Sequence, residues 1–235
     1  MLTLALDTST PAVSVGLADI TAPGDIEVRA EKTIVNPRAH AEQLTPLVQE
    51  ALASVSAKPT QLSAIVAGVG PGPFTGLRVG LVTAASMGHA LGIPTYAVCS
   101  LDAIGHAATK DDAQATPLLV ATDARRKEIY WAVYNAQGQR VTGPDVSKPA
   151  DLPPEAAETA GMVGDGAQLY AETLALPLSH GWRYPPMSGL FALAAERITA
   201  GADGEALTPL YLRRPDVHVA GKPAGDRRMP SQTQA

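Results

Sequence analysis

The sequence predicts an α/β protein made of two related halves, the second smaller than the first. Short apolar runs of strand length alternate with longer stretches in which apolar residues recur at helical spacing. After a polar stretch at 109–114 the pattern starts again with an apolar run, 117–123, which ends in an aspartate as the first run does. The chain of 235 residues is long enough for two small units or one large one.

Three apolar runs joined by turn residues open the first half and predict three strands. The segment 38–55 then repeats apolar residues at helical spacing and predicts an amphipathic helix. The predicted strands are 2–6, 12–18, 27–35, 62–69 and 95–99, and the predicted helices are 38–55, 74–91 and 101–108. Strands that alternate with helices in this order are typical of a sheet covered on both faces.

The second half repeats this beginning in shorter form. Its predicted elements are strands at 117–123 and 128–135, an extended proline-rich stretch at 144–154 and a helix at 188–200. A repeated three-strand unit is typical of a duplicated actin-like architecture (ASKHA, ribonuclease H-like), βββαβα in each of two subdomains, with the second one reduced. The predicted units are 1–108, 109–213 and a flexible C-terminal tail, 214–235.

The composition excludes several classes of protein. A net charge of −5 argues against a chain that grips nucleic acid by itself, because phosphate binding requires a basic face. Cys99 is the only cysteine, so the chain can form no internal disulfide. Its beginning does not resemble a leader sequence, and no apolar run approaches the ~20 residues of a membrane span. We therefore expect a cytoplasmic protein without a membrane segment.

The segment 68–80 joins a predicted strand to a long predicted helix through a loop rich in glycine and proline. This layout usually holds a phosphate, because glycines let backbone N–H groups approach an anion at a helix N-terminus. However, the loop lacks the Gly-Lys-Ser/Thr ending of a P-loop, and its Gly70-x-Gly72-x-x-x-Gly76 spacing does not match the dinucleotide fingerprint. The alternative is a tight turn whose glycines only permit close packing.

Five short segments occur in the order and spacing found in one bacterial protein family. They are 4–10, 70–78, 123–130, 164–166 and 209–213. On these segments the chain resembles the TsaB family, also called YeaZ, which is filed with the M22 glycoprotease-like proteins together with TsaD. The resemblance extends over roughly residues 1–215, and 70–78 and 123–130 are its most specific segments.

This resemblance implies a catalytically silent scaffold. Such a protein is expected to bind TsaD and, with the ATPase TsaE, to support transfer of a threonylcarbamoyl group to the adenosine beside the anticodon, in tRNAs that read codons starting with A. The resemblance also implies a homodimer when the chain is alone and contact with tRNA through the complex. No cofactor is expected, and nucleotide would bind only at a joint interface with TsaD.

Asp7 ends the first predicted strand, at a position where α/β sheets commonly form ligand sites. It either binds a magnesium-bound water beside phosphate-facing hydroxyls, or accepts hydrogen bonds within its own turn. The positive charges of 123–130 either face an anion or a partner, or pair with neighbouring carboxylates. A vestigial nucleotide or anion site would consist of Asp7, Thr8, Ser9, Gly70, Gly72, Thr75 and Arg125.

Small residues recur every four positions along the predicted helix 74–91. Glycine inside a helix costs roughly 0.5–1 kcal/mol relative to alanine, so this stripe indicates that another element approaches closely. That element is either a partner helix or the protein's own sheet. Because the resemblance implies pairing through the two helices 38–55 and 74–91, the partner is favoured. The predicted partner interface is Gly76, Arg78, Gly80, Ala84, Gly88, His40, Leu44, Leu47 and Ala51.

Two other functions stay open on the residues alone. An ASKHA-type small-molecule kinase would need a second phosphate-binding turn, which 123–126 does not supply. An M22-like metallopeptidase would need metal ligands, but none of the five histidines forms an i, i+4 pair. The stretch 98–104 also lacks the His-x-x-x-His pair that the relationship to TsaD would place there. No catalytic residue and no metal site are therefore predicted.

Overall fold

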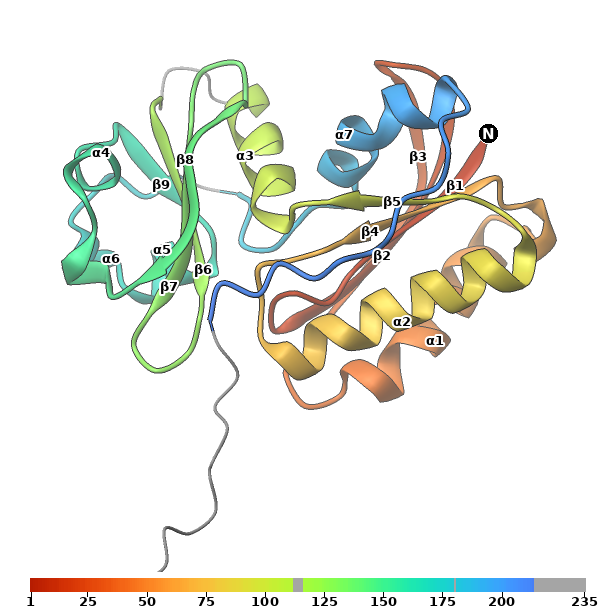
Figure 1. Ribbon diagram of the computed structural model, residues 1–235, viewed down its shortest axis with the longest axis horizontal. Helices are drawn as coiled ribbons and strands as arrows, with labels where there is room; N and C mark the ends of the chain where they lie inside the picture. The colour runs from red at the N-terminus through yellow and green to blue at the C-terminus, as the bar shows by residue number, and fades with distance from the viewer. Residues whose placement is uncertain (112–115, 180, 214–235) are drawn as a thin grey trace, which may run out of the picture.

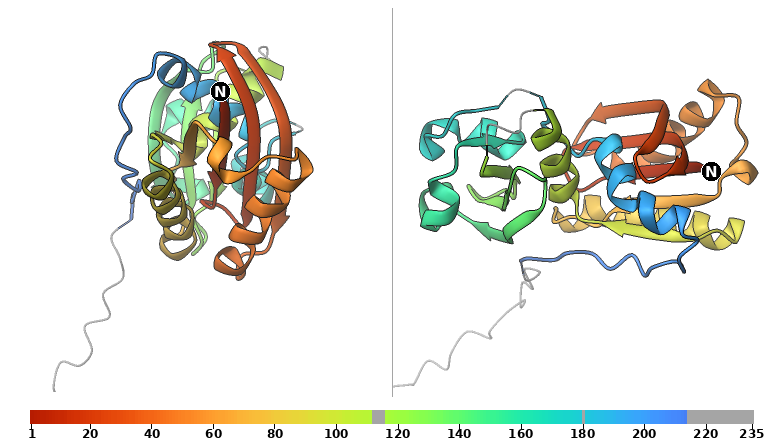
Figure 2. Two further views of the ribbon diagram at one scale, coloured as in Figure 1. Left: turned by 90° about the vertical axis from the view of Figure 1, so that its right-hand side faces the viewer. Right: turned by 90° about the horizontal axis from the view of Figure 1, so that it is seen from above.

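The computed structural model describes residues 1–111, 116–179 and 181–213, and within these residues two β-sheets form the framework (Figure 1). The first has the strand order β3-β2-β1-β4-β5, and the second has the order β8-β7-β6-β9. Figure 2 shows the two resulting subdomains side by side. The prediction of a duplicated α/β architecture with a smaller second half is confirmed. The predicted tail, 214–235, lies outside the described residues.

The first sheet is built around its first strand. Its strands are β1 (Leu2–Asp7), β2 (Ala12–Ala22), β3 (Asp25–Val35), β4 (Ala64–Gly68) and β5 (Thr95–Val98). β1 is antiparallel to β2 and parallel to β4, while β3 and β5 are the edges. Leu4 and Leu6 enter one hydrophobic core and Ala5 enters another, as the two-residue period of a strand requires. This sheet is therefore buried on both faces.

Helices cover the two faces of the first sheet. α1 (His40–Ser54) and α2 (Phe74–Leu91) lie on one face, and α7 (Met187–Thr199) lies on the other (Figure 1). Gly16 on β2 permits α7 to approach, because a Cβ there would lie 2.6 Å from the Cβ of Met187. A glycine within a strand thus has a packing reason at this position.

The second sheet is covered by one longer helix and three short ones. Its strands are β6 (Leu118–Asp123), β7 (Ile129–Tyr134), β8 (Arg140–Ser147) and β9 (Gly161–Val163). α3 (Ser100–Asp111) packs on one face through Leu101 and Ile104. The other face is covered by α4 (Pro154–Ala157), α5 (Asp165–Leu169) and α6 (Ala171–Leu174).

The packing of two helices differs from the predicted division of the chain after residue 108. α3 was placed in the first unit, yet its residues Leu101, Ile104 and Ala108 join the core of the second sheet. α7 was placed in the second unit, yet Leu190 and Phe191 are buried against the first sheet. The linker predicted to begin at residue 109 also starts as helix, because α3 continues to Asp111. The sequence marks helix positions, whereas the sheet that each helix covers is decided by tertiary contacts.

After α7 the chain runs back along the molecule as an extended segment. Residues 202–213, here called the strap, contain neither helix nor strand and pass from the β5 edge to the second subdomain (Figure 1). Among the residues described, no helix has both the length and the apolar character to cross a membrane.

Candidate functional site

Asp7, at the carboxyl end of β1, is fully engaged by hydrogen bonds from its own surroundings. Its Oδ1 accepts bonds from the backbone N–H of Ser9 at 2.8 Å and from the Ser9 hydroxyl at 2.7 Å. Its Oδ2 accepts the Ser100 hydroxyl at 2.5 Å. Burial raises the pKa of Asp7 above its ordinary value, although the bonds from Ser100 and Ser9 act in the opposite direction.

The structure thus favours the second of the two interpretations of Asp7. A Cβ added to Gly68 would lie only 1.7 Å from Asp7 Oδ2, so the carboxylate faces the backbone of β4 and not open space. A magnesium-bound water would need access to a free carboxylate oxygen. Asp7 is instead the centre of a buried network that ties β1 to the start of α3 through Ser100.

The glycine-rich loop is packed directly on the loop that follows β1. A Cβ on Gly72 would lie 2.3 Å from the carbonyl oxygen of Ser9. The Gly70 N–H, which a phosphate cradle would direct at an anion, donates to the Ser100 hydroxyl at 3.1 Å. Thr8 is engaged as well, since its hydroxyl donates to Gly76 O and accepts from Gly80 N. The glycines serve close packing here, and the loop offers no open phosphate cradle.

Two small cavities flank this packed region. One, of about 260 Å³, is lined by Gly72, Pro73, Phe74, Ala124, Arg125, Arg126, Tyr130, Tyr211, Leu212 and Arg213. The other, of about 220 Å³, is lined by Thr8, Thr10, Pro11, Pro37, His40, Pro73, Phe74, Thr75, Gly76 and Arg125. Both are smaller than the roughly 300–1,000 Å³ of typical ligand sites. Of the predicted anion site, Thr8, Gly72, Thr75 and Arg125 line one or both of these cavities, and of these four only Thr75 and Arg125 are exposed. Asp7, Ser9 and Gly70 line neither cavity.

Arg125 belongs to an unusual turn between β6 and β7. Arg125, Arg126 and Lys127 have φ values of +63°, +57° and +61°, a left-handed conformation that non-glycine residues adopt at a cost. The turn is held by Asp123, whose Oδ1 accepts the Arg125 N–H at 2.9 Å, and by backbone bonds between Ala124 or Arg125 and Glu128. An ion pair of 3.3 Å also joins Arg125 to Asp123. The positive side chains are therefore presented by a closed, strained hairpin.

Phe74 and Tyr211, which line the first cavity, form a cluster with Arg78. The guanidinium of Arg78 lies 3.7 Å from the ring centre of Phe74 and donates from Nε to the Tyr211 hydroxyl at 3.0 Å. The Phe74 and Tyr211 rings are 5.1 Å apart. Sequence reasoning included Arg78 but missed Phe74 and Tyr211. The only signal for Tyr211 was its place in the family-like segment 209–213.

The small-residue stripe of α2 packs against the protein's own sheet, which favours the second of the two interpretations of this stripe. A Cβ on Gly80 would lie 2.4 Å from Thr8 Oγ1, and one on Gly88 would lie 2.5 Å from Thr95 Cγ2. Ala84 is fully buried. The element that approaches closely is the protein's own sheet, together with the loop after β1, so the glycines have an intramolecular reason.

Most of the remaining predicted interface is internal as well. On α1, Leu44, Leu47 and Ala51 are buried in the core of the first subdomain. His40 is also buried, and its Nε2 is hydrogen-bonded to the carbonyl of Thr10 at 2.8 Å. Of the predicted interface residues, Arg78 is exposed and Gly76 is half-buried. Which residues contact a partner stays a prediction.

The fold and the site together define an actin-like protein of two α/β subdomains whose candidate phosphate loops are both bonded to Ser100. Residues 27–203 of the sequence match the family model of TsaD, tRNA N6-adenosine threonylcarbamoyltransferase. A crystal structure from Pseudomonas aeruginosa, described as an uncharacterized protein with similarity to peptidase YEAZ, has a TM-score of 0.73 and 31% identity. That match covers 90% of this chain and 99% of the other.

Two proteins are similar to this chain in sequence. An uncharacterized protein of Mycobacterium tuberculosis is 48% identical over 214 residues, which are 91% of this chain and 92% of the relative. The tRNA threonylcarbamoyladenosine biosynthesis protein TsaB of Escherichia coli is 35% identical over 131 residues, which are 56% of this chain and 54% of TsaB. The chain belongs to the TsaB (YeaZ) family, within the wider family that the TsaD model describes.

Proposed function

We propose that this chain is a non-catalytic scaffold of tRNA threonylcarbamoyladenosine synthesis, which acts in the cytoplasm by binding TsaD and, with TsaE, supports the transfer to tRNA. Family membership supplies the pathway. The proposal of a non-catalytic role rests on the hydrogen bonds of Asp7. Ser9 and Ser100 donate to both oxygens of this carboxylate, which would otherwise be able to bind a metal or a nucleotide. The chain then acts on tRNA through its partner.

The outer face of α2 is the surface that we propose for TsaD, and for a second copy of the chain when TsaD is absent. Val82 is 63% exposed, the highest value among the large apolar residues that the structure describes, and Phe74 is 41% exposed. Arg78 lies on the same exposed face. Aromatic and arginine side chains are enriched at the centres of protein interfaces, which supports this choice.

Val82→Arg is expected to weaken binding of TsaD at least about tenfold, because it would place a charge within an apolar contact. The exposed position predicts that folding is unaffected. The measurement is co-purification and titration with TsaD, with threonylcarbamoyladenosine in bulk tRNA determined by nucleoside mass spectrometry in cells that carry only the variant. Val141→Arg, on exposed β8, is the matched control. Unchanged binding in Val82→Arg would exclude this face, whereas unchanged modification in cells depleted of the chain would exclude the function.

The isolated chain is expected to release no phosphate from ATP above the level of a buffer blank. The reason is again the engagement of Asp7 and of the Gly70 N–H by Ser100. The assay is phosphate release with Asp7→Asn as the comparison. Turnover by the parent that disappears in Asp7→Asn would favour the kinase alternative over the scaffold.

A further inference from the structure

The strap, 202–213, is a third connection between the subdomains. The chain crosses from the first sheet to the second before α3 and returns before α7, and the strap then crosses again (Figure 1). We propose that the strap is a tie that holds the two subdomains in one relative orientation, with a fixed anchor at Glu205 and a releasable latch at Arg213.

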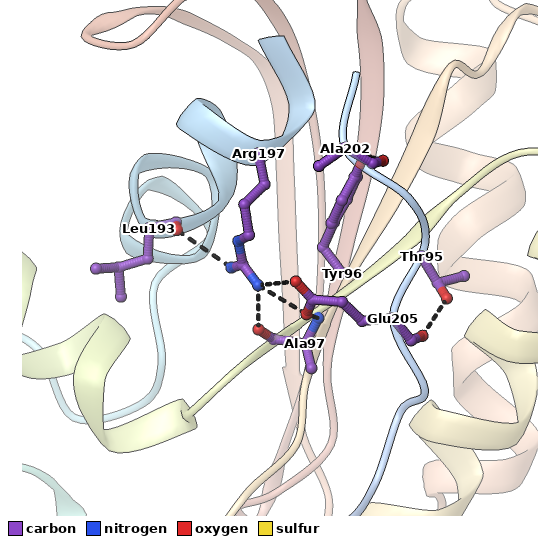
Figure 3. Close-up of polar contacts among 7 residues, drawn as sticks. All are labelled: Thr95, Tyr96, Ala97, Leu193, Arg197, Ala202 and Glu205. Atoms are coloured by element: carbon purple, nitrogen blue, oxygen red, sulfur yellow. Dashed lines mark hydrogen bonds and ion pairs between the residues drawn. The ribbon is translucent and has the colours of Figure 1, made fainter. Parts of the chain in front are cut away.

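The anchor is a hydrogen-bond network at the β5 edge of the first sheet (Figure 3). The Glu205 carboxylate accepts bonds from Arg197 Nη1 at 2.6 and 2.7 Å and from the Ala97 N–H at 3.0 Å. Arg197 also donates to the Ala97 carbonyl at 3.2 Å. The backbone N–H of Glu205 donates to the Thr95 carbonyl at 2.7 Å. The strap therefore satisfies polar groups that an edge strand would otherwise leave unpaired.

The hydrogen bonds of this anchor are formed at neutral pH. Burial by itself would raise the pKa of Glu205, but the Ala97 N–H and the Arg197 guanidinium outweigh burial and lower that pKa below its ordinary value. The carboxylate thus stays ionised, and its bonds to the guanidinium are charge-assisted. Tyr96 adds a further bond, since its hydroxyl donates to the Ala202 carbonyl at 2.7 Å.

Between its ends the strap stays with the first subdomain. The Leu210 N–H donates to the Val69 carbonyl at 2.8 Å, and Leu207 and Leu210 pack against the first core. Tyr211 then meets Phe74 and Arg78 at the start of α2. The strap is thus fixed by backbone bonds as well as side chains along the whole first subdomain.

The latch has a different character. Arg213 Nη1 donates to the Ala124 carbonyl at 3.1 Å, and the same guanidinium pairs with Glu128. Leu212 packs against the second core. Within the described residues, the end of the strap contacts the second subdomain through these side chains. A partly exposed ion pair opens more readily than a backbone ladder, so the connection is expected to open at Arg213 first.

The position of the latch links it to both the strained turn and the 260 Å³ cavity. Ala124 and Glu128 are the two ends of the left-handed turn, so Arg213 helps to hold its conformation. Tyr211, Leu212 and Arg213 form one wall of the 260 Å³ cavity, and Arg125 lines it from the second subdomain. Release of Arg213 would loosen the turn and widen this cavity while the anchor stays closed.

The orientation is measured on the full-length chain with spin labels at Thr60→Cys and Val141→Cys, on a Cys99→Ser background. Thr60 and Val141 are exposed and lie in different subdomains. The parent is expected to give one narrow distance distribution, and Arg213→Ala a broader and shifted one. Arg213→Lys, which keeps the charge but loses the guanidinium's several donors, should be intermediate. Arg29→Ala, which removes a surface ion pair with Asp19 on the first sheet, is the control and should match the parent.

Hydrogen exchange on the same variants separates the latch from the anchor. In Arg213→Ala the amides of 124–128 should exchange about tenfold faster or more, while those of 95–97 keep their protection. In Glu205→Gln the protection of 95–97 should fall. Distances and exchange that match the parent in both variants would overturn the proposal, because helix packing alone would then set the orientation. Equal loss of protection in both sheets of Arg213→Ala would also overturn it, since Arg213 would then be a general folding contact.

Discussion

Gly80→Leu is expected to destabilise the folded monomer by roughly 3 kcal/mol or more. The Cβ alone would lie 2.4 Å from Thr8 Oγ1, and that hydroxyl is fixed by its bonds to Gly76 O and Gly80 N. The side chain has no room to expand, so α2 must move away from the loop after β1. Urea unfolding followed by circular dichroism measures the effect.

Val82→Leu on the exposed face of the same helix is the control, and it should change the free energy of unfolding by less than about 0.5 kcal/mol. This expectation reverses the one drawn from the spacing of small residues, which placed a partner against Gly80. A Gly80→Leu protein that unfolds like the parent but no longer binds TsaD would restore the partner interpretation and refute the packing argument.

Asp165→Asn is expected to stabilise the protein above pH 6 by up to about 3 kcal/mol. Burial raises the pKa of Asp165 to about 6, with the Asp123 charge adding to this effect and the bond from the Asp123 N–H opposing it. Because the folded state then binds a proton that the unfolded state has released, stability falls as pH rises from about 4 to 6. An asparagine keeps an oxygen for the Asp123 N–H, which now lies 3.2 Å from Asp165 Oδ1, without a charge to bury.

The measurement is the unfolding free energy of parent and variant between pH 4 and pH 8. The two should agree near pH 4 and separate as pH rises, with the variant more stable. Asp151→Asn, at an exposed position in the same subdomain, is the matched control and should show no such separation. A constant difference at all pH values would mean that Asp165 acts through hydrogen bonding and not through its charge.

Local patterns were sufficient to locate most helices and strands. The predicted helix 74–91 coincides with α2, because helical spacing of apolar residues and a following glycine are visible within one segment. The predicted linker failed in its first residues, since α3 continues to Asp111. The α3 residues Leu101, Ile104 and Ala108 pack in the core of the second sheet, and a local pattern contains no information about that contact.

In the candidate site, too, local patterns raised the questions and contacts between distant residues decided them. Two interpretations of Asp7 were open on the sequence alone, and the partner that decides between them, Ser100, lies 93 positions further along the chain. The sequence also indicated that another element approaches the small residues of α2 closely, but it did not identify that element. The answer is Thr8 for Gly80 and Thr95 for Gly88, both from the protein's own first subdomain.

The sequence by itself determined the α/β class, the duplication, the positions of the main elements and the likeness to one family, because burial periodicity and motif spacing are local properties. Only the tertiary structure decided that the glycine-rich loop packs against the backbone of the loop after β1, and that the stripe of α2 faces inward. It also decided that Glu205 and Arg213 connect the strap to the two subdomains. These outcomes depend on which distant groups meet at hydrogen-bond or contact distance. Such meetings exist only once the chain has folded.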